Sequence, residues 1–389
     1  MKKYVLLGLF MTVIASTVSA QTSVTLYGVV DVGVLSQTLT SGNNDPKGNQ
    51  TSNQTGMASG QQSGSRWGLK GVEDLGNGLS ANFVYESSVS VNTGSSSGFT
   101  RQSTLGLESK VWGKLDLGRR LSPGTLAFDG IDPFANSFGT ASLNSSLGAT
   151  FSRISNMMMY TSPLINGFTA SIGYSFDADT KSIKGAPVSS GYTYKSEQWG
   201  STTKTRAFNL GLRYANGPLV LGALYAQYMP AAWKTGNSPV VANAPSPKQW
   251  SLGGTYDFKV VKVHAAYGQN IQGIVEGASV LSSFTDGGDT DSGGGILFAS
   301  GARATSWMLG LSAPAGAEGK VLLSWQQMTP GGSFKNSNFI NTQNVGSIGY
   351  TYSMSKRTNL YAYYSYMSNS SMSAGSKANS LGVGVRHLF

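Results

Sequence analysis

Few residues in this 389-residue chain could carry acid–base, nucleophilic or metal-binding chemistry. There is no cysteine, and the two histidines are His264 and His387. Hydrolysis needs a base, a nucleophile and an orienting acid within reach of one another. No serine and acid stand in that arrangement around His264, and strand periodicity puts His387 on an apolar face. The residues therefore predict no catalytic site.

An acidic, glycine-rich stretch is the best candidate for binding a metal. Asp286–Asp291 reads Asp-Gly-Gly-Asp-Thr-Asp and offers the oxygen ligands that Ca²⁺ prefers. It lacks the bidentate glutamate and the spacing of an EF-hand. We favour a solvated loop tip as its explanation, because loop tips are commonly polar and variable. We expect no cofactor elsewhere in the chain.

The elements that hold these residues are mainly strands, and the last one is the clearest. In Leu381–Phe389, an apolar face that ends on Phe389 alternates with a small or polar face that includes Arg386. This period of two is typical of a membrane β-barrel strand, which is apolar toward lipid and polar toward the lumen. A final strand that stops on an aromatic residue fits an outer-membrane barrel, and Phe389 is its candidate assembly signal.

The first twenty residues have the pattern of a secretory signal peptide. Lys2 and Lys3 precede an apolar run, and small residues precede a cut after Ala20. The run is too short for a transmembrane helix, and a buried N-terminal helix is the alternative. We therefore expect a signal peptide over residues 1–20 and a single β-barrel domain over residues 21–389, located beyond the inner membrane.

The composition agrees with an exported membrane barrel. Charged residues make up 12% of the chain, against about 25% in ordinary soluble domains. The 51 glycines argue against a helical protein, and the 11% aromatic content argues against a disordered one. The net charge of +10, or +8 without Lys2 and Lys3 (10 − 2), is dispersed, so we expect no nucleic-acid binding.

Alternating segments recur along the chain and predict about sixteen strands, an even number as in bacterial single-chain barrels. The expected strands lie near Val24–Val34, Ser65–Val72, Leu79–Val89, Thr100–Glu108, Gly113–Arg119, Ser155–Thr161, Phe168–Phe176, Thr205–Tyr214, Pro218–Tyr228, Lys248–Tyr256, Val260–Gln269, Ala304–Leu311, Lys320–Gln327, Asn344–Ser353, Asn359–Met367 and Ser380–Phe389. Short connections alternate with long ones such as 35–64. The predicted fold class is all-β, a transmembrane antiparallel up-and-down β-barrel. Aromatic residues such as Tyr361 and Tyr363 are expected as anchors at the lipid interface, although the alternation breaks in Leu360–Tyr366 and leaves the choice between lipid and lumen open for some of its tyrosines.

Several stretches resemble the Gram-negative general porins of the neisserial and burkholderial type. They are Ser23–Asp31 (SVTLYGVVD), Ser65–Gly78 (SRWGLKGVEDLGNG), Gly113–Arg119 (GKLDLGR) and Val385–Phe389 (VRHLF), in the order that the family has them. The resemblance spans the whole mature chain. It implies a homotrimer of sixteen-stranded barrels, each a water-filled diffusion channel whose third outer loop folds inward as a constriction.

The resemblance also implies which residues line the constriction. The stretch between Arg119 and Arg153 is the candidate third loop, and it contributes the acids Asp129 and Asp132. Barrel-wall arginines are expected opposite that loop. The candidates for this basic wall are Arg66, Arg101, Arg119, Arg120 and Arg153.

The chain departs from the family pattern at two places. Gln commonly follows the arginine that ends the fifth strand, whereas here the pair is Arg119-Arg120, and Ala141–Thr150 matches no family pattern. Arg119 and Arg120 cannot both face the lumen of a regular strand, so one of them is expected on the loop. Arg101 shares a face with leucines, which makes a rim position or a bulge its alternative. For all these arginines, simple pairing with acids is the competing interpretation.

These features predict an outer-membrane channel for passive diffusion of small hydrophilic solutes and inorganic ions. Arginines outnumber acids at the expected constriction, so we expect a preference for anions. A channel specific for small carboxylates is one alternative, and an adhesive or structural barrel is another. The expected partners are the lipid bilayer, further copies of the chain in a homotrimer and the outer-membrane assembly machinery.

Overall fold

The computed structural model describes residues 23–43, 49–178, 205–229, 245–275 and 297–389. The expected signal peptide and the Asp286–Asp291 stretch lie outside these residues. The strands are β1 Ser23–Thr40, β2 Thr51–Ser59, β3 Arg66–Gly76, β4 Leu79–Ser90, β5 Ser95–Ser96, β6 Gln102–Ser109, β7 Gly113–Leu121, β8 Arg153–Thr161, β9 Phe168–Ser175, β10 Arg206–Asn216, β11 Leu219–Met229, β12 Lys248–Asp257, β13 Lys262–Ile274, β14 Leu297–Pro314, β15 Gly319–Gly332, β16 Gln343–Ser353, β17 Thr358–Ser368 and β18 Lys377–Leu388. The helical elements are α1 Pro123–Ala127 and the short 3-10 helices η1 Gly139–Ala141, η2 Leu143–Ser145, η4 Ser333–Asn336 and η5 Ser370–Met372. Within the described residues, no helix is long and apolar enough to cross a bilayer.

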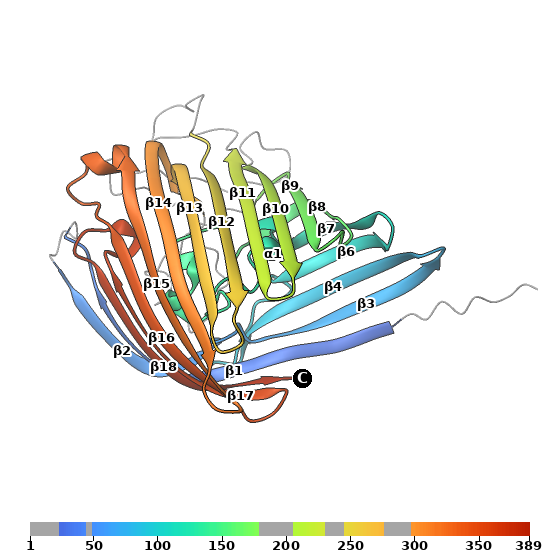
Figure 1. The fold of residues 1–389 in the computed structure, drawn as a ribbon, viewed down its shortest axis with the longest axis horizontal. Coiled ribbons are helices and arrows are strands. Elements are labelled where there is room, and N and C mark those ends of the chain that lie inside the picture. The colour runs from blue at the N-terminus through green and yellow to red at the C-terminus, as the bar shows by residue number, and fades with distance from the viewer. Residues whose placement is uncertain (1–22, 44–48, 179–204, 230–244, 276–296) are drawn as a thin grey trace, which may run out of the picture.

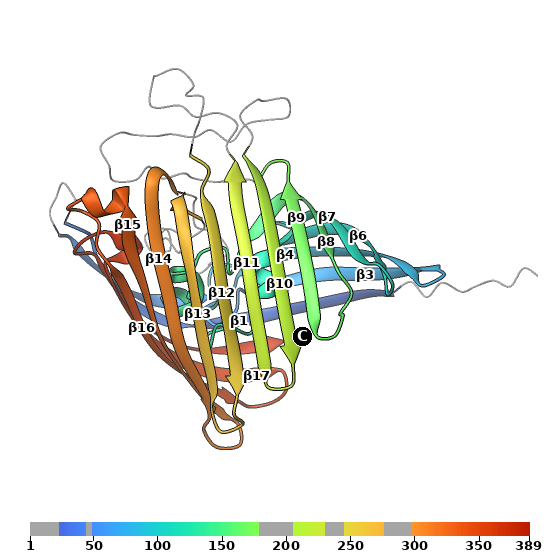
Figure 2. The same ribbon diagram turned by 45° about the horizontal axis from the view of Figure 1, so that its top comes forward.

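The strands form one antiparallel sheet that closes on itself (Figures 1 and 2). β1 completes the closure, because it pairs with β18 on one side and with β2 and β3 on the other. β2 and β3 pair with successive parts of β1 and so form one interrupted wall strand, while β5 is a two-residue pair beside β4. Over the described residues the wall therefore has sixteen strands, which confirms the predicted barrel.

Neighbouring side chains in the wall alternate between an exposed apolar face and a buried polar face. In β12, Leu252 is 56% exposed whereas the adjacent Ser251 is fully buried. In β15, Trp325 is exposed and Gln326 is fully buried. Because the sheet is closed, the buried face is the interior of the barrel, and the apolar face points outward as lipid requires.

The first wall strand is longer than its apolar pattern indicated. We expected a strand near Val24–Val34 followed by a long connection, but β1 continues to Thr40 and pairs with β2. Polar side chains bond across this pair, as in Thr38 Oγ1 to Asn53 Oδ1 at 2.7 Å. A ladder that extends beyond the hydrocarbon layer needs no apolar face, so the alternation that marks a membrane strand is missing there.

The tyrosines of β17 also correct an expectation. Tyr361 and Tyr363, expected as interface anchors, are each 4% exposed and face the interior, whereas Tyr364 and Tyr366 are exposed on the outer face. Tyrosines occupy both parities of this strand, so the local sequence does not tell the two faces apart. The register of β17 with β16 and β18 sets which ones point inward.

Candidate functional site

The connection between β7 and β8 lies against the interior wall, and we call Ser122–Ser152 the inner segment (Figures 1 and 2). Its helix α1 begins at Ser122, whose Oγ accepts the Thr125 N–H at 3.2 Å. Glycines on the wall receive its backbone: a Cβ on Gly211 of β10 would lie 2.2 Å from the Pro123 carbonyl oxygen. A Cβ on Gly222 of β11 would lie 2.5 Å from the Ala127 carbonyl oxygen. The strand sequence therefore leaves room for this segment.

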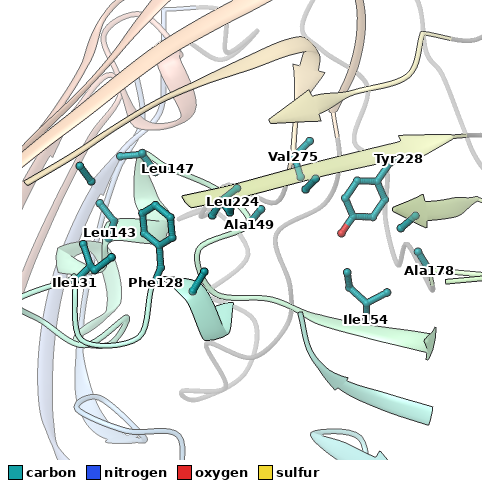
Figure 3. Packing of buried hydrophobic residues seen from close by; sticks show 14 of the residues in the cluster. Phe128, Ile131, Leu143, Leu147, Ala149, Ile154, Ala178, Leu224, Tyr228 and Val275 are labelled. Carbon is teal, nitrogen blue, oxygen red and sulfur yellow. The ribbon is translucent and has the colours of Figure 1, made fainter. Parts of the chain in front are cut away.

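Apolar side chains of the inner segment form a core inside the barrel (Figure 3). Phe128, Ile131, Leu143 and Leu147 are fully buried and pack in one cluster with Leu224 of β11. Burying a side chain of this size stabilises a fold by about 2 kcal/mol. Several such residues on one connection, together with buried apolar side chains of the wall such as Met157 and Met308 in the same cluster, explain why it folds against the wall.

Polar side chains of the wall fasten the backbone of the inner segment. Gln326 of β15 donates to the Ala141 carbonyl at 2.8 Å and accepts the Ser146 hydroxyl at 2.7 Å. Farther along the wall, the Thr140 hydroxyl bonds to Ser365 of β17 at 2.9 Å. These interior side chains satisfy carbonyls and hydroxyls of an irregular backbone that would otherwise be buried without partners.

The two histidines have structural partners. His264 of β13 is buried, and its Nδ1–H donates to the Ile131 carbonyl of the inner segment at 2.8 Å. Its Nε2 therefore accepts the Ser312 hydroxyl at 3.0 Å, which leaves neither ring nitrogen available as a base. His387 lies exposed on the outer face, and its Nδ1 bonds to Thr358 Oγ1 at 2.9 Å.

The structure places the two acids of the inner segment differently. Asp132 is 3% exposed, and its carboxylate accepts the backbone N–H groups of Phe134 and Asn136, each at 2.9 Å, and of Leu143 at 2.7 Å. Burial raises the pKa of Asp132 to about 6, while these amide bonds hold it down. Asp129 is exposed, and its backbone carbonyl accepts from Arg213 of β10.

Arg66 and Arg101 meet at one carboxylate. Arg101 Nε donates to Glu86 Oε1 at 2.8 Å, and Arg66 Nε lies 3.5 Å from Glu86 Oε2. The Tyr27 hydroxyl donates to the same Oε2 at 3.0 Å. Arg101 precedes β6 and is 3% exposed, so it lies inside the barrel.

Arg153 and Arg119 complete this group, which we call the basic cluster: Arg66, Arg101, Arg119 and Arg153 with Glu86. Arg153 interacts electrostatically with all four other members. Its guanidinium lies 5.3 Å from the ring centroid of Phe151, a cation–π contact. Arg119 donates to the Thr100 carbonyl and, at 2.8 Å, to Ser155 Oγ. The cluster occupies the wall from β3 to β8.

Arg120 belongs to a separate pairing. It forms an ion pair with Asp116 of the same strand, and Lys114 Nζ lies 3.3 Å from the other oxygen of that carboxylate. We expected either Arg119 or Arg120 on the loop, but β7 contains both. The register between β7 and β8 shifts between Gly118 and Arg120, and this irregularity breaks the strict alternation.

Glu86 and Asp116 are partners of the arginines that were not among the predicted site residues. Both occupy interior positions of expected strands, and each is nearly fully buried. The feature of the sequence that could have identified them is a lone acid at an interior position of an expected strand. The same parity puts Asp31 and Lys70 on the interior face of their strands; Asp31 is fully buried, and Lys70 Nζ lies 5.5 Å from the Tyr27 ring centroid.

Comparisons with known proteins match porins over nearly the whole chain. A family model described as Gram-negative porin matches residues 7–371. An outer membrane porin protein of Bordetella pertussis is 39% identical over 406 residues, covering 100% of both chains. Outer membrane porin protein 32 of Delftia acidovorans is 29% identical and covers 99% of each chain. Among solved structures, an anion-selective porin from Comamonas acidovorans has a TM-score of 0.65 and 26% identity, over 95% of this chain and 100% of that one.

Proposed function

The chain belongs to the Gram-negative porin family and is an outer-membrane β-barrel, and from that premise we propose that it is an anion-preferring channel for passive diffusion. The solutes would be inorganic anions and small hydrophilic molecules. The observation that carries the proposal is the basic cluster, in which four arginines and one glutamate gather on the wall from β3 to β8, a net charge of +3 (4 − 1). Fixed charge at a narrow point determines which ions pass.

We propose that the inner segment is the inward-folded third outer loop and narrows the channel. By chain order it is the third of the connections at its end of the barrel. It contacts the wall from β9 to β17, while the basic cluster lies on the wall from β3 to β8. The passage would then run between an apolar, weakly charged segment and a wall of arginines.

The acids of the inner segment oppose the arginines only weakly. The Asp132 carboxylate is occupied by three backbone amides and is buried, which leaves Asp129 as the exposed acid of that segment. Arginine donates two parallel hydrogen bonds to a carboxylate or a phosphate. Anionic metabolites would therefore bind at the same wall. The solved neighbour described as an anion-selective porin supports this proposal at the level of the family.

Three further proposals follow from family membership. We propose that the protein acts as a homotrimer, that Phe389 is its assembly signal and that it has no catalytic role. For Phe389, the support is its place at the seam, where its N–H and C=O bond to the backbone of Gly28, both at 3.1 Å. For the absence of catalysis, the support is that both nitrogens of the interior histidine His264 are engaged.

The test is the reversal potential of the purified protein in a planar lipid bilayer under a KCl gradient. We expect chloride preference, and we expect it to weaken in Arg66→Ala and Arg153→Ala. Lys356→Ala is the matched control, because it removes one positive charge from an exposed turn. Chloride preference that survives both arginine substitutions would refute the proposed site, and cation preference would refute the proposed selectivity. Saturable block by one carboxylate would favour the substrate-specific alternative, and the absence of conductance would favour an adhesive barrel.

A further inference from the structure

The interruption between β2 and β3 is a bulge of six residues, Gly60–Ser65, which we call the 60–65 bulge. β1 pairs with β3 through Val29 and with β2 from Val32, so two residues of β1 stand opposite the six residues of the bulge. The Gln61 side chain lies over two glycines: a Cβ on Gly382 would be 2.2 Å from its Oε1, and a Cβ on Gly33 would be 2.8 Å from its Nε2. The wall is therefore shaped to receive the bulge.

Asp31, one of the two β1 residues opposite the bulge, binds it with backbone and side chain. Its carbonyl accepts the Gly60 N–H and the Ser65 hydroxyl, both at 2.8 Å. Its backbone N–H donates to Ser65 Oγ at 2.9 Å. Carboxylate oxygen Oδ2 accepts the Ser63 N–H at 2.6 Å, and Oδ1 accepts the Tyr361 hydroxyl at 2.5 Å. Asp31 is 0% exposed, and its bonds to Ser65 and to Tyr361 are buried.

A second polar chain holds the bulge from β17 and β18. Arg386, which lies opposite Asp31 in the strand register, donates its Nε to Asn359 Oδ1 at 3.0 Å. The Asn359 amide donates to Gln62 Oε1 at 2.7 Å. The bulge is thus tied both to β1 and to the last two strands of the barrel, which limits its freedom to move.

The bulge contacts the two parts of the proposed constriction. The Gln61 carbonyl accepts the N–H of Phe138 in the inner segment at 2.7 Å. On its other side, Arg66 Nη1 donates to the Gly64 carbonyl at 2.9 Å and to Ser63 Oγ at 3.2 Å. Phe138 also packs edge-to-face on Tyr361, with ring centroids 5.6 Å apart. One small element therefore joins the inner segment to the basic cluster.

We propose that Asp31 is a positioning residue for ion selection: by fixing the 60–65 bulge, it sets the position of Arg66 relative to the inner segment. This inference rests on the proposed function. A guanidinium held by the Gly64 carbonyl and the Ser63 hydroxyl keeps its charge at a defined point of the passage, whereas a free arginine spreads that charge over many rotamers. Asp31 itself need not contact the permeating ion.

Asp31→Asn tests the proposal because the loss of positioning and the loss of charge change the preference for chloride in opposite directions. Removal of a buried negative charge, taken alone, would raise the preference for chloride. Loss of positioning lowers the chloride preference: Asp31 accepts the Ser63 N–H and the Tyr361 hydroxyl at two different oxygens, and in an asparagine one of these positions becomes an NH2 group, which donates. We expect the chloride-to-potassium permeability ratio to fall by about twofold or more, since a charge displaced within the screening length changes the local ion energy on the scale of RT.

Tyr361→Phe is the second variant, since it changes no charge and keeps the ring that packs on Phe138. It removes one bond to the Asp31 carboxylate, so we expect the chloride-to-potassium permeability ratio to fall by less than in Asp31→Asn. In the double variant Asp31→Asn with Arg66→Ala, the two effects should not add, because Asp31 acts through Arg66.

Additive effects in the double variant, or a higher chloride preference in Asp31→Asn with no change in Tyr361→Phe, would overturn the inference. These outcomes are read against a wild-type channel with measured chloride preference. A wild type without that preference would instead contradict the proposed function, so the two failures are distinguishable. If Asp31→Asn does not assemble, Tyr361→Phe alone decides: an unchanged permeability ratio would refute the positioning role.

Discussion

At the scale of single residues, Glu86 determines how much of the arginine charge is balanced. It is the carboxylate shared by Arg66 and Arg101, and its side chain is 5% exposed. In Glu86→Gln the cluster gains one net positive charge, so we predict that the chloride-to-potassium permeability ratio rises by roughly twofold. The measurement is the reversal potential under a KCl gradient.

The control for this prediction is Asp74→Asn, an equal change of charge at an exposed position near the end of β3. Arg101 loses its buried partner in Glu86→Gln, and breaking a buried pair costs about 3 kcal/mol. We therefore expect a lower unfolding temperature together with the altered selectivity. An unchanged permeability ratio in a folded Glu86→Gln channel would show that the cluster does not face the ion path.

Asp132 predicts a dependence of stability on pH. Its folded-state pKa of about 6 lies above the ordinary value of 3.8. At a pH between these two values, the Asp132 carboxyl of the folded protein holds a proton that the unfolded chain has lost. The free energy of unfolding should therefore fall as pH rises from about 4 to about 6, by at most about 3 kcal/mol, and level off above.

Asp132→Asn should remove this pH dependence, because the amide does not titrate. The measurement is the free energy of unfolding of both proteins in detergent micelles between pH 4 and pH 7 (about the range in which a carboxyl with this pKa titrates). Asp129→Asn, an exposed acid in the same segment, should keep the wild-type profile. Parallel profiles for wild type and Asp132→Asn would contradict the prediction.

At the scale of elements, glycines of the wall determine where α1 can lie. A Cβ on Gly222 would come within 2.5 Å of the Ala127 carbonyl oxygen, which is backbone and has little freedom to yield. In Gly222→Ala we predict that α1 moves away from β11 and into the passage, which lowers the single-channel conductance. The sign of the ion preference should stay the same, because the basic cluster lies on other strands.

Gly56→Ala is the matched control for the glycine substitution. A Cβ at Gly56 of β2 would meet nothing within 4 Å, so this variant should conduct like the wild type. Single-channel recordings of the two variants under identical salt test the difference. Equal conductance in both would show that α1 does not rest on the Gly222 position during conduction.

At the scale of the whole molecule, selection by fixed charge predicts a strong dependence on salt. The screening length is about 10 Å at 0.1 M and about 3 Å at 1 M ionic strength. We predict that the chloride-to-potassium permeability ratio falls toward unity as mean KCl rises to 1 M, at a fixed concentration gradient. The swelling rate of proteoliposomes in an uncharged sugar should not change. A ratio independent of salt would indicate a specific binding site in place of a long-range field.

The alternation of residues along the chain predicts the barrel, the approximate strand positions and the side of the wall that faces lipid. It could do so because a bilayer imposes a period of two on every strand and leaves no unpaired edge. The exceptions are informative. β2 was missed because its polar residues show no apolar alternation, and Tyr361 and Tyr363 were placed on the wrong face because their strand has tyrosines at both parities.

The partners of the charged side chains, in contrast, follow from the tertiary structure. Glu86 joins Arg66 and Arg101, Asp132 turns to backbone amides, and Asp31 reaches Tyr361 across 330 positions of sequence. Each pairing depends on strand register and on the path of the inner segment through the barrel. Strand register and the path of the inner segment leave no local pattern in the amino-acid sequence. A register shift, for example, changes the partner of every side chain without changing any residue.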